Sequence, residues 1–171
     1  MNTFRDAVFK LIPGNGIEFL PKGPGIYAMW NRINRMWNIG QSKNIHQRCV
    51  LHRNQLQQGT AYNMRIRRDV QVHGADAFFF MVLERVDLTA TENLQRELNQ
   101  LEVWWVVQLQ AHVEHRGYNF EAGGCRTSGA RFRDRERKLM RRNSDKYCLL
   151  PHVDIYDAID SDLLASWVPG N

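Results

Sequence analysis

Three short runs of β-prone residues stand out in the pattern of hydrophobic and polar positions. Residues 25–30 and 36–39 are separated by the polar, turn-like stretch 31–35, a spacing that predicts a β-hairpin. Residues 77–86 are rich in aromatic and branched side chains, which predicts a buried strand. The pattern therefore contains three strands.

Apolar residues recur with helical spacing between and after these runs. Residues 43–58 follow Ser42, a residue favoured at helix N-caps, and end before Gly59. Residues 62–73 end in the same way before Gly74. A longer helix is expected to begin at Thr91. Its apolar stripe consists of Leu94, Leu98, Leu101, Trp105 and Leu109.

The two ends of the chain have a different character. Residues 4–11 predict a short amphipathic helix that ends before Pro13, with a loop after it. Residues 130–142 predict a helix of mixed charge, and residues 154–164 a last, acidic one. We therefore predict three parts, namely an N-terminal helix and loop (1–23), a central domain (24–124) and a basic helical tail (125–171).

The composition is that of an ordinary soluble globular chain, with 43% hydrophobic and 24% charged residues. No apolar run approaches the ~18 residues that a membrane span needs. We expect a cytoplasmic protein without membrane contact. The cysteines stand far apart with no CxxC pair, so nothing indicates a disulfide framework or a thiolate zinc site.

The positive charge is concentrated in one segment. Residues 126–142 contain eight basic and two acidic residues, a net of +6 in a chain whose total is +5. A cationic segment on an otherwise balanced domain is expected of a protein that binds the nucleic-acid backbone. The alternative is a solvated helix with a chance excess of arginine. The residues expected to bind nucleic acid there are Arg126, Arg131, Arg133, Arg135, Arg137, Lys138, Arg141 and Arg142.

Two polar residues of the first long helix share a face with its apolar residues. On an ideal helix, Arg48 and His52 project from the same side as Ile45 and Leu56. An arginine and a histidine that are partly buried need partners, and an anionic ligand is one way to supply them. The alternative is a structural hydrogen-bonded pair in the core.

Glu102 lies at the rim of the apolar stripe of the second long helix. A carboxylate there needs a cation or hydrogen-bond donors. Mg²⁺ takes oxygen ligands and keeps several waters, so a single protein carboxylate can be enough to hold it. The alternative is a boundary glutamate that reaches solvent.

These residues belong to an ordered set of short motifs. The set runs Gly25-Ile26-Tyr27, Asn38-Ile39-Gly40-Gln41-Ser42, Asn44, Arg48, His52, Gly59, His73-Gly74, Glu102 with Trp104 and Trp105, and Gly117-Tyr118-Asn119. It resembles the GIY-YIG nuclease family, in the branch found in phage and homing endonucleases. The resemblance covers the central domain.

The resemblance implies an α/β (α+β) fold, a three-stranded antiparallel sheet flanked by helices with the basic tail behind it. It also implies a metal-dependent endonuclease that hydrolyses phosphodiester bonds in double-stranded DNA with Mg²⁺ or Mn²⁺. By this resemblance Tyr27 orients or activates the attacking water, Arg48 neutralises charge on the phosphate, and Glu102 holds the metal.

The resemblance implies two further members of the site. His52 would transfer a proton or contact the phosphate, and Asn119 would be an amide that orients the site. Gln41 and Lys43, at and after the second motif, are expected to contact nucleic acid as well. The oligomeric state is not indicated.

One position departs from the family pattern. Where the second motif normally has tyrosine, this chain has Asn38, whose amide can position water but cannot act as a phenolic acid or base. Asn38 is nevertheless a candidate catalytic residue, and Tyr62 or His46 is a candidate to replace the missing tyrosine. The departure leaves open an alternative function, a DNA-binding regulator or decoy that keeps the fold but cuts weakly or not at all. A third possibility is a structural protein whose basic stretch contacts an acidic protein.

Overall fold

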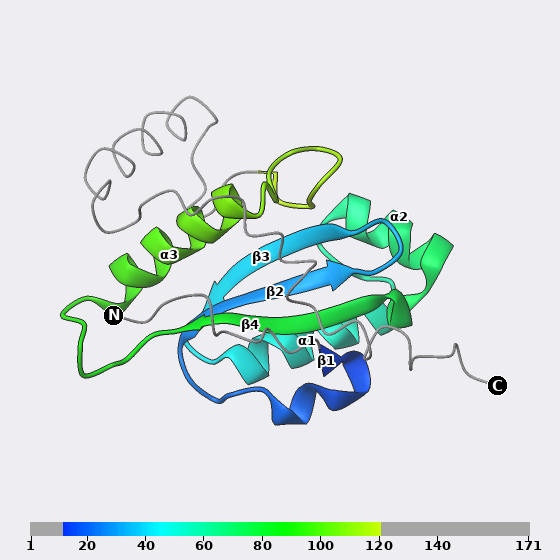
Figure 1. Cartoon of the computed structure of the whole chain (residues 1–171). Helices are drawn as coiled ribbons and strands as arrows, with labels where there is room; N and C mark the ends of the chain where they lie inside the picture. The colour runs from blue at the N-terminus through cyan, green and yellow to red at the C-terminus, as the bar shows by residue number, and fades with distance from the viewer. Residues whose placement is uncertain (1–11, 121–171) are drawn as a thin grey trace, which may run out of the picture.

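A computed structural model describes residues 12–120 of the chain (Figure 1). The predicted N-terminal helix at 4–11 and the predicted basic tail lie outside the described residues.

The sheet is built around strand β2 (Gly25–Asn31), all seven of whose residues are buried. It pairs antiparallel with β3 (Met36–Ser42) on one side and with β4 (Phe78–Arg85) on the other. The short strand β1 (Ile12–Pro13) pairs antiparallel with β4, so the strand order is β1-β4-β2-β3.

Among the residues described, the sheet therefore has four strands, and the prediction of three was one short. Ile12 and Pro13 were expected at a helix end and in a loop, because two residues that include a proline carry no alternating pattern. Proline is tolerated on an edge strand, where its missing N–H removes no hydrogen bond from the sheet interior. The predicted hairpin is confirmed, with β3 three residues longer than expected.

Within residues 12–120, three α-helices follow the predicted order, namely α1 (Ile45–Gln57), α2 (Met64–His73) and α3 (Leu94–Gln108). Each begins after an asparagine whose side chain accepts a hydrogen bond from the first turn, Asn44, Asn63 and Asn93 respectively. The predicted N-caps Ser42 and Thr91 were wrong by two residues. Ser42 remains in β3, and its hydroxyl donates to the carbonyl oxygen of Asn44.

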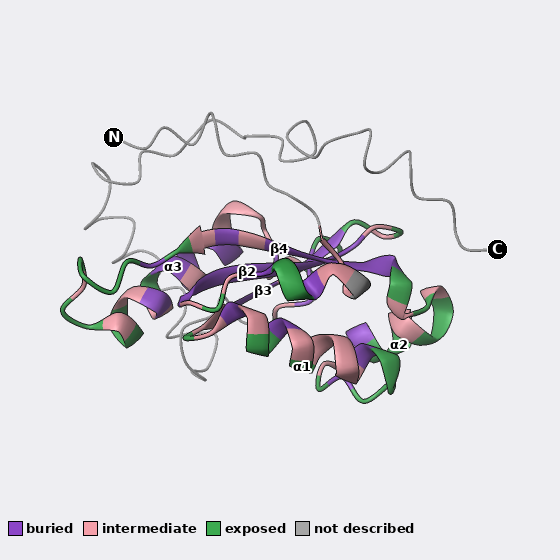
Figure 2. Cartoon of the chain, turned by 90° about the horizontal axis from the view of Figure 1, so that it is seen from below, coloured by how far each residue is buried: buried purple, intermediate pink, exposed green. Residues whose placement is uncertain are grey.

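The helices enclose the sheet from both faces. α3 packs on one face, where Leu98, Leu101 and Trp105 join Ile26 and Ala28 in one hydrophobic cluster. α1 and α2 lie on the opposite face (Figure 1), and Figure 2 shows the buried strands between helices that expose their outer sides. The apolar stripe predicted for α3 is confirmed.

Two 3₁₀ helices complete the part of the fold that the structure describes. The first, η2 (Gly14–Phe19), and the residue after it place Ile17 and Leu20 in the cluster beneath α1. The second, η3 (Ala75–Ala77), connects α2 to β4. Among the described residues, no helix is long and apolar enough to cross a bilayer.

The outer edge of β3 is covered by the segment that follows α3. Trp37 exchanges backbone hydrogen bonds with this segment, donating to Arg116 and accepting from Tyr118. The Asn119 amide then accepts from the Ile39 N–H at 2.8 Å and donates to the Ile39 carbonyl at 2.9 Å. The side chain of Asn119 thus continues the pairing where the backbone of the segment leaves the strand.

Candidate active site

The phenol of Tyr27 is the most deeply buried polar group of the predicted site. Tyr27 is only 2% exposed and lies beside an irregularity in the β2–β4 pairing, the kind of bulge that re-aims a side chain. Its cross-strand partner on β3 is Gly40. Because glycine has no side chain, the ring can pass over β3 toward α1.

The Tyr27 hydroxyl contacts two polar side chains of α1, Arg48 and His52, which the helical projection placed on one face. His52 Nε2 lies 2.8 Å from the hydroxyl oxygen, and Arg48 Nε donates to it at 3.3 Å. The direction of the Tyr27–His52 bond follows the histidine tautomer: when the ring proton is on Nδ1, the phenol donates to Nε2. The three side chains form one hydrogen-bonded cluster.

Arg48 differs from the prediction in its burial. It was expected to be partly buried on the apolar face, but its side chain is exposed, whereas His52 is half-buried. The α1 face borders an open cleft at this level instead of the core. The guanidinium therefore reaches solvent while its Nε remains bound to Tyr27.

The surroundings keep Tyr27 and His52 uncharged at neutral pH. Burial raises the pKa of Tyr27 to about 12, although the positive charge of Arg48 opposes the rise. Burial also lowers the pKa of His52 to about 4, and the Arg48 charge adds to this decrease. At neutral pH His52 is thus a neutral imidazole, and its Nδ1–H tautomer is the form that accepts from the Tyr27 hydroxyl.

Glu102, on α3, lies at the same cleft as Tyr27, Arg48 and His52. It is half-buried, as its place at the rim of the apolar stripe predicted. Its Oε2 accepts a hydrogen bond of 3.0 Å from Gln41 Nε2, and the same nitrogen donates to Asn99 Oδ1 at 2.5 Å. Gln95 Nε2 donates to Gln41 Oε1. The Gln41 amide, predicted to contact nucleic acid, is therefore engaged with α3 and holds one oxygen of Glu102.

One cleft of about 580 Å³ brings these groups together. It opens between α1, α3 and the β3 edge of the sheet, and its walls include all six predicted catalytic residues. These are Tyr27, Asn38, Arg48, His52, Glu102 and Asn119. Asn38 lines the cleft from β3, two residues before Gly40.

The other predicted contacts fall in different places. Lys43 is exposed just before α1 and does not line the cleft. His46 is also absent from the cleft wall, and its Nδ1 lies 3.2 Å from the Ile17 carbonyl oxygen. Tyr62 lines the cleft and is 80% exposed. The eight basic residues predicted between Arg126 and Arg142 lie outside the described residues.

The fold is similar to the catalytic domain of the homing endonuclease I-TevI. That solved structure has 24% sequence identity and a TM-score of 0.47, covering 56% of this chain and 96% of its own. A mutant of the catalytic domain of intron endonuclease I-TevI has 22% identity and the same TM-score, covering 61% of this chain and 98% of its own. No family model and no curated protein sequence matches the chain.

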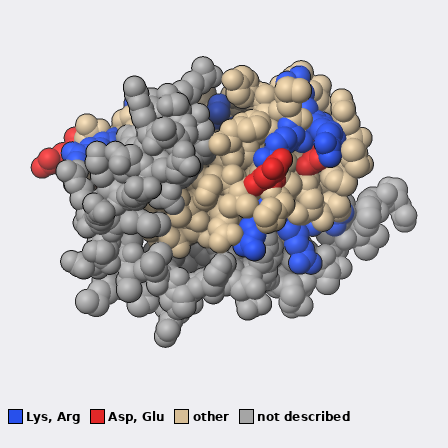
Figure 3. All heavy atoms as spheres, turned by 90° about the horizontal axis from the view of Figure 1, so that it is seen from above, with Lys and Arg blue, Asp and Glu red and all other residues tan. Residues whose placement is uncertain are grey.

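The sequence did not point to a second group of basic residues, within the described part of the chain. α2 carries three arginines, Arg65, Arg67 and Arg68, and it contacts the hairpin turn that carries Arg32 and Arg35, since Asn34 Nδ2 donates to Asp69 Oδ2 at 2.7 Å. Figure 3 shows lysine and arginine side chains gathered at this end of the molecule, with a few acidic ones among them. The sequence did not reveal this group, because only the fold brings the hairpin turn beside α2.

Proposed function

We propose that the chain is a metal-dependent endonuclease that hydrolyses phosphodiester bonds in DNA. The observation that carries the proposal is the hydrogen-bonded cluster of Tyr27, Arg48 and His52 in a cleft that also contains Glu102. Hydrolysis of a phosphodiester needs an aligned nucleophile, an acceptor for its proton and positive charge near the phosphate. The cleft offers a side chain for each task.

Arg48 supplies the positive charge. Its Nε is bound to Tyr27, and a guanidinium carries further N–H donors in a planar fork that suits phosphate oxygens. Because the side chain is exposed at the cleft, it can contact a phosphate without a change in the fold. Its charge acts most strongly where the phosphate oxygens gain charge in the transition state.

Tyr27 and His52 form a path for the proton of the attacking water. The Tyr27 oxygen receives a hydrogen bond from the water as its own proton moves toward His52 Nε2, 2.8 Å away. The low pKa of His52, about 4, makes it a weak base in the empty cleft. A bound phosphodiester brings a negative charge that favours the imidazolium, so substrate raises the basicity of His52 when it is needed. The Asn38 amide holds the water from the β3 side.

Glu102 suits a hard divalent ion such as Mg²⁺ or Mn²⁺. Such an ion takes carboxylate oxygens and keeps several waters, and one half-buried carboxylate held by Gln41 meets this need. In the described part of the chain, no three His, Cys, Asp or Glu side chains group to hold an ion, which does not suit a zinc site with three or four protein ligands. When bound, the ion would stabilise charge on the leaving oxygen.

The DNA partner is proposed from charge as well as from the cleft. The basic residues of α2 and the hairpin turn, together with the basic segment 126–142, would contact backbone phosphates. Such contacts carry no sequence information and make affinity depend strongly on salt.

A plasmid-nicking assay tests the proposal. Supercoiled DNA is incubated with the full chain in Mg²⁺, in Mn²⁺ and in EDTA, and nicked product is expected only with the ions. Glu102→Gln is expected to abolish cutting while DNA affinity stays within a few-fold of wild type. Glu97→Gln, a matched change on the same helix but outside the cleft wall, should leave cutting intact.

Two outcomes would overturn the proposal. Tight DNA binding with no cleavage of any DNA form in either ion would leave the alternative, a binding protein with a nuclease-like fold. Normal cutting by Glu102→Gln would make Glu102 structural and remove the metal site.

A further inference from the structure

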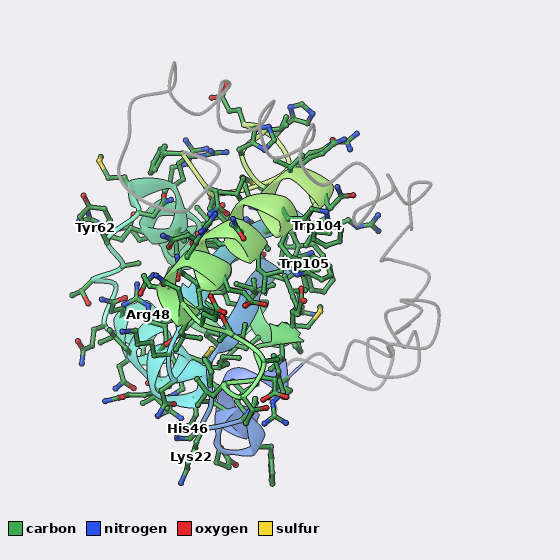
Figure 4. The ribbon with its side chains drawn as sticks, turned by 90° about the vertical axis from the view of Figure 1, so that its left-hand side faces the viewer. Lys22, His46, Arg48, Tyr62, Trp104 and Trp105 are labelled. Atoms are coloured by element: carbon green, nitrogen blue, oxygen red, sulfur yellow. The ribbon has the colours of Figure 1, made fainter. Side chains whose placement is uncertain are left out.

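Two large aromatic side chains stand exposed at the cleft that holds the proposed active site. Tyr62 is 80% exposed and Phe120 is 67% exposed, and both line the cleft with Arg48 and His52. In Figure 4, Tyr62 and Arg48 lie on one side of the molecule, while Trp104 and Trp105 lie on the other side of α3. Single exposed aromatics are common, but two at the rim of a polar cleft call for a reason.

The exposure of Tyr62 is imposed by its two neighbours. Ala61 is 6% exposed and packs in the cluster beneath α1. Asn63 caps α2 with its side-chain oxygen and donates from Nδ2 to the Tyr118 carbonyl oxygen at 2.6 Å. With an anchored residue on each side, the Tyr62 side chain is directed outward.

Phe120 is presented in a similar way. It follows Tyr118, which is fully buried, and Asn119, whose amide is bound to the backbone of Ile39. The bond from Asn63 to Tyr118 ties the segment that carries Tyr62 to the segment that carries Phe120. Both aromatic side chains are therefore held near the same end of the cleft by anchored backbone.

We propose that Tyr62 and Phe120 stack against an unpaired base beside the reacting phosphate. Every base has a π-face, and aromatic side chains bind bases by stacking without reading their sequence. In a regular duplex the neighbouring bases cover both faces, so stacking on protein requires a base that has left the helix. The preferred substrate of the site is then DNA with an unpaired nucleotide at the cut, as in a bulge, a loop or a flap.

The size and lining of the cleft agree with this substrate. About 580 Å³ is within the ~300–1,000 Å³ of pockets that hold one small ligand, so the cleft has room for a single nucleotide. Arg48 lies at the same cleft as the two aromatic residues. A nucleotide placed with its phosphate at Arg48 can thus turn its base toward the rim. The inference rests on the proposed function only in placing a phosphate in the cleft.

The inference is tested by measuring DNA affinity under conditions in which the DNA is not cut. The full chain in EDTA is titrated into a fluorescent DNA duplex and into the same duplex with a one-base bulge of 2-aminopurine. Wild type is expected to bind the bulged form about 5- to 150-fold more tightly, the range that one stacked base supplies. Stacking should also quench the 2-aminopurine emission.

Matched variants test whether the preference for the bulge depends on Tyr62 and Phe120. Tyr62→Ala and Phe120→Ala should each lower the preference for the bulge and the quenching, while Tyr62→Phe should keep both because a phenyl ring still stacks. Phe19→Ala removes an equally exposed aromatic from η2, outside the cleft, and should change neither.

The results separate this inference from the proposed function. Preference for the bulge that depends on Tyr62 and Phe120 supports the inference even if the chain never cuts DNA. Equal affinity for both duplexes in wild type, or equal losses for both in the alanine variants, overturns it even if the chain cuts plasmid DNA. In that case the rim serves another occupant, such as a protein.

Discussion

The phenol ring of Tyr27 lies across Gly40, so closely that a methyl group on Gly40 would stand 2.6 Å from Cζ of the ring. Real side chains essentially never approach to that distance, and the ring would have to move. Glycine is therefore required here by the path of Tyr27 to α1, and not by the conformation of the strand.

We predict that Gly40→Ala displaces the Tyr27 hydroxyl from Arg48 and His52. Cleavage should fall at least about 10-fold, and the free energy of unfolding should fall by about 1–3 kcal/mol from overpacking. Nicking rates and urea denaturation measure the two effects. Gly23→Ala is the control, since a methyl group there would meet only the tip of Arg85 at 4.0 Å. Unchanged cleavage in Gly40→Ala would show that the position of the phenol does not matter.

Arg48→Ala should reduce the rate more than the affinity. If the guanidinium acts on charge that develops in the transition state, cleavage should fall by about 100-fold or more while the DNA Kd changes only a few-fold. Single-turnover cleavage and a binding titration separate the two. Arg85→Ala, which also removes an exposed positive charge but lies at the end of β4, should leave the rate within a few-fold. Equal losses of rate and affinity would make Arg48 a clamp for the ground state.

His52 gives the protein a pH dependence of known sign. Its pKa is about 4 in the folded chain against 6.5 in the unfolded chain, so between these values only the unfolded state gains the proton. The free energy of unfolding should therefore fall as the pH drops from 6.5 toward 4, by at most about 3 kcal/mol, with no contribution above 6.5.

An NMR titration of the histidine rings checks this value directly. The His52 resonance should shift with a midpoint near 4, and DNA bound in the absence of metal should raise that midpoint. Urea denaturation at pH 4.5 and 7 should show a smaller difference for His52→Gln than for wild type. A midpoint near 6.5 in the free protein would contradict the burial of the His52 ring that lowers its pKa.

Tyr118 is predicted to matter for stability. Its hydroxyl accepts hydrogen bonds from the Nδ2 atoms of Asn31 and Asn34, both at 2.9 Å, and donates to Asp69 Oδ2 at 2.7 Å. Tyr118→Phe removes partners from a buried amide and a carboxylate, which should cost about 1–3 kcal/mol in unfolding free energy. Exposed Tyr62→Phe should change it by less than ~0.5 kcal/mol. Equal stability of the two variants would mean that water replaces the hydroxyl.

The periodic elements could be predicted from the sequence, but their ends and the smallest strand could not. Helix starts shifted because Ser, Thr and Asn are all favoured N-caps, and Ser42 and Thr91 each precede by two residues an asparagine that caps instead. β1 needs β4 beside it to exist at all, and no local pattern of two residues shows that.

The site was predicted partly by periodicity and partly by family resemblance. Helical projections singled out Arg48, His52 and Glu102, the resemblance added Tyr27, Asn38 and Asn119, and the structure brings all six to one cleft. A helical projection put Arg48 on an apolar face, but it cannot distinguish a face that packs in the core from one that borders a cleft. The bond from Gln41 to Glu102 joins β3 to α3, so it depends on the fold and has no signature in the sequence.

The segment that lies along β3 has a consequence for solubility. An uncovered outer strand offers unpaired backbone groups to other molecules and is a common starting point for aggregation. Here Trp37 and Ile39 are already satisfied, the first by the backbone of Arg116 and Tyr118 and the second by the Asn119 amide. The few residues after α3 thus cover the outer edge of the strand that carries Asn38 and Gly40 and block its pairing with another molecule. A chain that stopped before Gly117 would open that strand, and it should self-associate through the uncovered edge of β3.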